Sequence, residues 1–82
     1  MESISISWKG QDGMMYLKED HTIHIEIDGV TLIQIHTLLS ATTYGKERIT
    51  LVWSTSCGRH GITVRITSEP AIRTLDMIKS HW

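Results

Sequence analysis

The sequence has very little cysteine and proline and lacks phenylalanine: its 82 residues include one Cys, one Pro and no Phe. The single cysteine, Cys57, cannot form an internal disulfide, which excludes the disulfide-built scaffolds of small secreted proteins. It also disfavours a four-ligand zinc site, which would need three further well-placed ligands. Small domains often compensate for a small core by self-association, so we expect this chain to form a homodimer.

Net charge and long apolar runs are also nearly absent. Eight basic residues against nine acidic ones give a formal charge of −1, so the chain lacks the field that draws proteins to nucleic acids or anionic lipids. No apolar run reaches the roughly 18 residues of a transmembrane helix. The opening residues, MESISISWKG, lack the features of a secretion signal. We therefore expect no membrane association and a cytoplasmic location, which is the host cytoplasm if a phage encodes the protein.

What the sequence does contain is β-branched residues in alternating patterns, which favour strands. Ser3–Lys9 alternates Ile and Trp with Ser, and a glycine-containing turn leads from it to a shorter predicted strand, Met14–Lys18. These two strands would form a hairpin. His21–Ile27 is the third predicted strand, with its isoleucines on one face. The absence of repeats and low-complexity segments indicates a single domain over residues 1–82.

The segment after the third strand allows two interpretations. Asp28-Gly29 between alternating runs is typical of a two-residue hairpin turn, which would make VTLIQI a returning strand. Against this, Thr31 can cap a helix, and the apolar residues that follow it have helical spacing. Those residues are Leu32, Ile35 and Leu39. We favour a helix over residues 30–39, ended by Thr42–Gly45.

The C-terminal half predicts a second hairpin and a second helix. Arg48–Ser54 and Ile62–Thr67 both alternate, and the short connection between them indicates a hairpin. Ser68-Glu69-Pro70 then marks a helix start, because proline suits the first helical position. The apolar stripe of this helix is expected to consist of Ala71, Leu75, Ile78 and Trp82.

This order of elements predicts an α+β domain. The expected architecture is a two-layer sandwich, in which an antiparallel or mixed sheet of four to five strands carries two helices on one face (β-β-β-α-β-β-α). The other face of the sheet would be flat and polar, and open to water or to a partner. The residues expected on that face are Ser3, Ser5, Ser7, His24, Glu26, Thr50, Thr63, Arg65 and Thr67.

Residue groups able to carry chemistry are few. Cys57 and His60 lie on one glycine-containing connection and could form a thiol or metal site, but no residue with suitable spacing completes it. The five histidines follow no ligand spacing, and Glu26 beside His24 lies on an open face where an acid–base pair stays solvated. We therefore predict no enzyme activity, no cofactor and no metal. A Cys57/His60-dependent metal or thiol protein is an alternative.

Nucleic-acid binding is a further alternative. The basic residues that could cluster on adjacent predicted strands and their connection are Lys46, Arg48, Arg59 and Arg65. Sheet surfaces that bind RNA use exposed aromatic residues as stacking platforms. Trp8 and Trp53 alternate in phase with the core isoleucines and should point inward, which leaves Tyr16 and Tyr44. We therefore rank nucleic acid below protein as a partner.

Recognition of another protein is the function that these patterns favour. A small domain without a catalytic group or cofactor motif acts through its surface, so we predict a non-enzymatic protein-binding module. Inhibitors and adaptors, including those that phages encode against host machinery, have this build. The Ser3–Lys9 strand is the expected sheet edge for pairing with another chain. The expected partner-binding residues are Ser3, Ser5, Ser7, His24, Glu26, Arg59, His60, Thr63 and Arg65.

Overall fold

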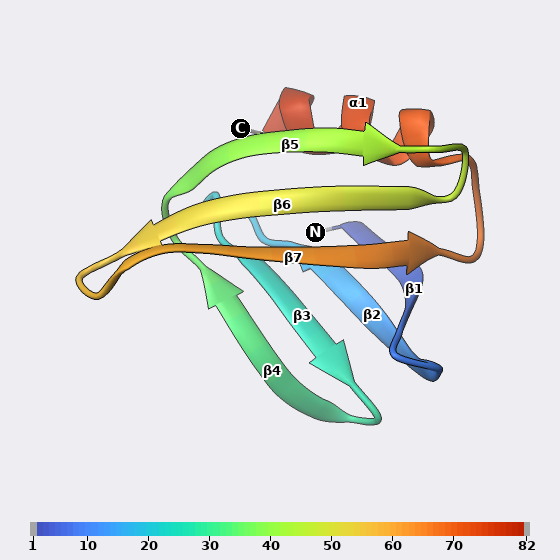
Figure 1. The fold of residues 1–82 in the computed structure, drawn as a ribbon, viewed down its shortest axis with the longest axis horizontal. Coiled ribbons are helices and arrows are strands. Elements are labelled where there is room, and N and C mark those ends of the chain that lie inside the picture. The colour runs from blue at the N-terminus through green and yellow to red at the C-terminus, as the bar shows by residue number, and fades with distance from the viewer. Residues whose placement is uncertain (1, 82) are drawn as a thin grey trace.

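The computed structural model of the protein describes residues 2–81 and places them in one antiparallel sheet and one helix (Figure 1). The elements are β1 (Glu2–Trp8), β2 (Gln11–Leu17), β3 (Ile23–Ile27), β4 (Val30–Ile35), β5 (Leu38–Tyr44), β6 (Arg48–Thr55), β7 (Gly58–Ile66) and α1 (Ala71–His81). Their order across the seven-stranded sheet is β4-β3-β2-β1-β7-β6-β5. The prediction of an α+β sandwich with four to five strands and two helices is therefore wrong, because the chain is mostly β-structure.

The two predicted hairpins are confirmed. β1 pairs with β2 along its whole length, from Glu2 opposite Leu17 to Trp8 opposite Gln11. β6 pairs with β7 from Arg48 opposite Arg65 to Thr55 opposite Gly58. In all four strands the buried apolar residues recur at every second position on one side of the sheet, as period-two patterning requires, whereas Met14 of β2 and Val52 of β6 lie half-buried on the other side.

The predicted helix over residues 30–39 is two strands, β4 and β5. Each strand has a β-bulge, where one extra residue faces no partner: Leu32 in β4 and Leu39 in β5. A bulge shifts the alternation by one position, so Leu32, Ile35 and Leu39 acquire a spacing that resembles a helical stripe. The side chains show the difference, since Ile35 is buried whereas Leu32 and Leu39 are 44% and 41% exposed.

The turn between β3 and β4 is the hairpin turn that the Asp-Gly pair indicates. Asp28 and Gly29 both have positive φ, 53° and 79°, which is the conformation of two-residue turns whose twist matches that of the flanking strands. The segment expected to end the helix, residues 42–45, instead completes β5 and enters the turn to β6.

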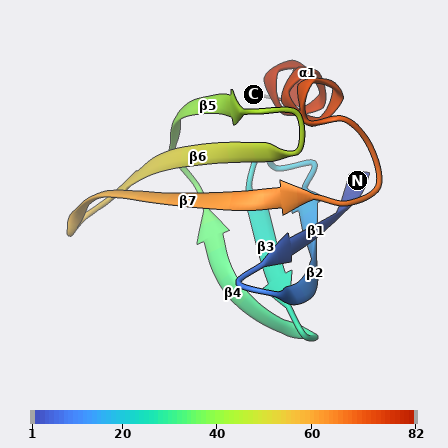
Figure 2. The ribbon, with the colours of Figure 1, turned by 45° about the vertical axis from the view of Figure 1, so that its right-hand side comes forward.

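The sheet is strongly bent, so that it forms two halves with their apolar sides facing each other. β1 and β7 share only two paired positions, Ile6 opposite Ile66 and Ser7 opposite Arg65. From this junction β1–β4 and β5–β7 diverge and cross at an angle (Figures 1 and 2). The buried residues of both halves form a single core cluster, which includes Trp53 as predicted. The expectation of a flat open face is wrong for this reason.

Helix α1 bridges the two halves. It packs mainly on β5, with further contacts to β6 and β7, and it buries Ala71, Thr74, Leu75 and Ile78. The Ala71 backbone N–H donates to the Lys46 carbonyl at 3.0 Å, so the helix begins against the β5–β6 turn. At its other end the His81 Nε2–H donates to the Lys18 carbonyl in the β2–β3 loop.

Two predictions about this helix have different outcomes. The predicted start beside Pro70 and the burial of its apolar stripe are confirmed for Ala71, Leu75 and Ile78, whereas Trp82 lies outside the described residues. With 11 residues, α1 is too short and too polar to cross a membrane, and residues 2–81 contain no other helix.

Candidate functional site: the outer face of the sheet and the β4 edge

The strand registers arrange the outward side chains of β1–β4 in rows. One row contains Ser3, Tyr16, His24 and Gln34, and the next contains Ser5, Met14, Glu26 and Thr31. The structure therefore places the predicted residues Ser3, Ser5, Ser7, His24 and Glu26 on the outer side of one half of the sheet. Most of them are half-buried by their neighbours.

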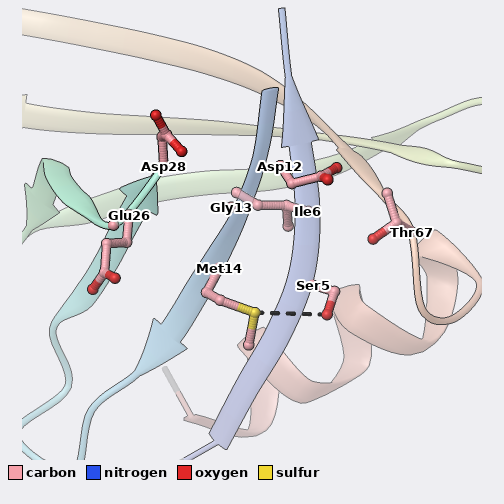
Figure 3. A pocket seen from close by; sticks show the side chains of 9 residues that line it. Ser5, Ile6, Asp12, Gly13, Met14, Glu26, Asp28 and Thr67 are labelled. Carbon is pink, nitrogen blue, oxygen red and sulfur yellow. Dashed lines mark hydrogen bonds between the residues drawn. The ribbon is translucent and has the colours of Figure 1, made fainter. Parts of the chain in front are cut away.

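The outer side of this half contains an open hollow of about 500 Å³. Figure 3 shows Asp12, Glu26 and Asp28 around Gly13, at the centre of the hollow. Gly13 is needed here because a Cβ atom would overlap the Glu26 carbonyl oxygen and lie 2.6 Å from Ile27 Cδ1. Within residues 2–81 none of the three carboxylates has an ion-pair partner. The hollow can therefore accept a cationic group.

The outer side of β5–β7 is different, and we call it the Arg/Thr face. Its residues are Thr42, Tyr44, Arg48, Thr50, Arg59, Thr63 and Arg65. Tyr44, Arg48 and Arg65 form one row across the three strands, and Thr42, Thr50 and Thr63 form the next. The Oγ1 atoms of Thr50 and Thr63 are hydrogen-bonded at 2.9 Å. Arg59 lies at the far end of β7.

Charge is divided between the two halves. Residues 38–66 contain four of the eight basic residues, Lys46, Arg48, Arg59 and Arg65, and one of the nine acidic ones, Glu47. Glu47 Oε2 accepts from Arg65 Nε at 3.1 Å in an ion pair whose side chains are both more than half exposed. The formal charge of −1 for the chain thus combines +3 on β5–β7 and the turn beside them with −4 elsewhere.

The β6–β7 hairpin separates residues that the sequence placed together. Arg59 is on the outer side, whereas His60 is in register with Trp53 on the apolar side, where their rings stack at 5.8 Å. His60 Nε2 also hydrogen-bonds to Thr55 Oγ1 at 2.9 Å. Cys57 is exposed at the hairpin tip, and within residues 2–81 no hydrogen bond joins it to His60. This geometry does not assemble a nucleophile with a base.

Three histidines converge at the end of α1. His21, His36 and His81 line a small pocket of about 210 Å³ together with apolar residues. The His21 Nδ1–H donates to the His81 carbonyl at 2.8 Å, which ties the β2–β3 loop to the helix end. No group of three His, Cys, Asp or Glu residues within the described chain is arranged to hold a metal ion. His21 and His81 fasten the helix end to the β2–β3 loop through their hydrogen bonds.

The β2–β3 loop also holds the one side-chain carboxylate among residues 2–81 whose pKa is clearly displaced. The Thr22 hydroxyl donates to Asp20 Oδ1 at 2.6 Å, and the Thr22 backbone N–H donates to the same oxygen at 3.1 Å. These two hydrogen bonds stabilise the ionised form and lower the pKa of the Asp20 carboxyl. The Asp20 carboxylate thus stabilises the β2–β3 loop through Thr22, and it lines neither the hollow nor the Arg/Thr face.

The free edges of the sheet are β4 and β5, not the strand predicted from the sequence. β1, which covers the predicted Ser3–Lys9 strand, is paired on both sides, with β2 and β7. β5 is lined by α1. Along β4 no segment lies beside the free side in either view (Figures 1 and 2), and Val30 and Leu32 are 67% and 44% exposed.

Sequence reasoning missed the acidic hollow, the β4 edge and the exposure of Tyr44. A signal existed for the hollow, because an isolated glycine within a strand often marks a close backbone approach. The predicted partner-binding residues are spread over the outer sides of two halves of the sheet, which meet where Ser7 lies opposite Arg65, and His60 lies on the apolar side. No protein-family model, curated protein or solved structure matches the chain.

Proposed function

We propose that the protein is a small non-enzymatic protein-binding module, an inhibitor or adaptor, that binds an extended segment of its partner along β4. The observation that carries this proposal is the state of that strand: β4 is an unpaired sheet edge with two exposed apolar side chains and no charged residue or proline. Its place of action would be the cytoplasm.

Unpaired edges are usually protected in soluble proteins. Charged side chains, proline, bulges and covering helices each hinder the addition of a second chain to the sheet. β5 has the covering helix, whereas β4 has only the bulge, and that bulge leaves Leu32 exposed. An edge of this kind presents backbone N–H and C=O groups that an incoming strand can satisfy.

The chemistry of β4 also restricts the partner segment. Backbone hydrogen bonds would supply much of the affinity, and Val30 and Leu32 would contact alternate side chains of the incoming strand. Because β4 has no charge, these positions favour apolar or uncharged residues in the partner. A second copy of this chain offers such a strand in its own β4, so self-association is one form of the same interaction.

Peptide display with immobilised protein tests the proposal. Selection should enrich extended, uncharged peptides that bind the wild-type chain, and Leu32→Lys should reduce their affinity at least about ten-fold, because an edge lysine opposes strand addition. Sedimentation velocity over a range of concentrations then shows whether a second copy occupies the same edge, since Leu32→Lys should abolish that association as well.

Ile72→Lys is the matched control. Ile72 is 59% exposed on α1, away from β4, so this variant introduces the same charge in place of another exposed apolar residue. It should bind the selected peptides like the wild type. Equal losses in both variants, or a wild-type chain that binds no peptide and sediments only as a monomer, would show that β4 is not a binding edge.

A further inference from the structure

We propose a second site, independent of β4: the Arg/Thr face binds single-stranded nucleic acid, with phosphates on its arginines and a base stacked on Tyr44. The sequence alone ranks this function low, because its pattern points Trp8 and Trp53 inward and does not place Tyr44 on the sheet. The structure places Tyr44 there, 66% exposed and in register with Arg48.

The first step of the argument is the charge of this face. Arg48 and Arg65 are directly opposite each other on neighbouring strands, an arrangement that like-charge repulsion makes unfavourable unless an anion lies between them. Glu47 pairs with Arg65 from the β5–β6 turn, but an exposed ion pair of this kind is weak and can be exchanged for a phosphate. Arg48 has no ion pair within residues 2–81.

The second step is the spacing of the cations. Arg59 lies six residues from Arg65 along the same side of β7, which corresponds to about 20 Å at the usual rise of a strand. The hydroxyls of Thr50 and Thr63 lie between the two ends, and hydroxyls commonly bind phosphate and sugar oxygens. Glu47, in the turn beside the face, is the single acidic residue of residues 38–66. The result is a basic strip with hydroxyl groups in its centre.

The third step is the position of the aromatic ring. Tyr44, Arg48 and Arg65 occupy adjacent strands, so about 10 Å separates the first and last of them at the usual strand spacing. A base that stacks on Tyr44 therefore brings its flanking phosphates within reach of both arginines. Stacking requires an unpaired base, which selects single strands over duplexes.

Fluorescence anisotropy with a labelled oligo(dT) of about 12 nucleotides tests this inference. This length lies within the range of about 4–16 nucleotides that one OB-fold, a small β-barrel domain, covers on a single strand. The wild-type chain should bind at about 50 mM salt, and the affinity should fall as salt rises. Arg48→Ala and Arg65→Ala should each reduce the slope of log K against log salt by about 0.7, which is the value for one phosphate of a single strand.

Tyr44→Ala separates stacking from charge. Loss of one stacked base should weaken binding about ten-fold while leaving the salt slope unchanged. Tyr44→Phe keeps the ring and should bind like the wild type. Arg73→Ala is the matched control for the arginines, because Arg73 is exposed on α1, outside the Arg/Thr face, and this variant should keep both affinity and slope.

Three results would each overturn the proposal. The first is that the wild-type chain fails to bind the probe at low salt. The second is that Arg73→Ala weakens binding as much as Arg48→Ala does. The third is that the same oligonucleotide, annealed to its complement, binds as tightly as the single strand. Circular dichroism of each variant shows that the substituted proteins retain the wild-type fold.

Discussion

Arg48 and Arg65 face each other across β6 and β7, and Glu47 contacts Arg65 but not Arg48. Two like charges in register on neighbouring strands destabilise a sheet. We predict that Arg48→Thr, which also suits a strand, raises the free energy of unfolding by about 0.5 kcal/mol. Urea denaturation at low salt measures the change, and the gain should shrink at high salt because the repulsion is screened.

Glutamate at the same position extends this prediction. Arg48→Glu would place a carboxylate opposite Arg65 and should stabilise the sheet at least as much as threonine does. If Arg48→Thr and Arg48→Glu are both less stable than the wild type, repulsion between the two arginines does not limit stability. The direct opposition of Arg48 and Arg65 then needs another explanation.

Two glycines in strands provide a matched test of packing. A Cβ atom at Gly13 would overlap the Glu26 carbonyl oxygen, whereas at Gly61 the nearest atoms are 3.7 Å and 3.8 Å away. Gly13→Ala should therefore lower the free energy of unfolding by more than about 2 kcal/mol, in the range of overpacked sites. Gly61→Ala should have little effect or stabilise slightly, because alanine restricts the unfolded chain more than glycine does.

Thermal and urea denaturation of the two glycine variants measure both effects. Similar stabilities would mean that β2 and β3 are farther apart at Gly13 than the structure shows.

Thr74 has a buried hydroxyl that makes no hydrogen bond within the described chain. Burying an unpaired polar group costs free energy, and valine has nearly the same shape without that group. We expect Thr74→Val to raise the free energy of unfolding by about 1 kcal/mol, as measured by urea denaturation. Thr74→Ser, which keeps the hydroxyl and loses a methyl group, should be less stable than the wild type.

The lowered pKa of Asp20 predicts how the stability of the fold depends on pH in acidic solution. Its pKa is lower in the folded chain than the ordinary value because Thr22 donates two hydrogen bonds to it. The stability that these hydrogen bonds give to the folded chain is present above the unfolded-state pKa of about 4. It is lost as the pH falls through the lower pKa of the folded state. Asp20→Asn should therefore show a shallower loss of stability below about pH 4 than the wild type.

The test compares the denaturation midpoints of the two proteins from about pH 2 to about pH 7. This range includes the pH at which aspartates titrate. Parallel curves would show that the Thr22 hydrogen bonds do not favour the ionised carboxyl.

The alternation of apolar and polar residues predicts the bounds of some strands accurately. The pattern in Ser3–Lys9 and Arg48–Ser54 predicts β1 and β6 to within one residue at each end, because each strand buries one side. The same reasoning failed at Leu32 and Leu39, since each is an extra residue in a bulge. A bulge depends on how two strands pair, and a local pattern does not record that pairing.

The candidate sites depended on long-range pairing in the same way. The sequence identifies Arg48 and Arg65 as basic residues of adjacent strands, but their direct opposition follows from the β6–β7 register. Tyr44 falls in the segment that the sequence predicts to end a helix, so the sequence pattern does not place its ring on a sheet face beside the arginines. The order of the strands made the predicted edge strand central and left β4 free.

The central claim is that β4 binds an extended protein segment, and backbone amide NMR tests it most directly. With a peptide selected on the wild-type chain, we predict chemical-shift changes and slower amide exchange along Val30–Ile35 and little change on the Arg/Thr face. Changes confined to β5–β7 or to the β6–β7 hairpin tip, with β4 unaffected, would contradict the account.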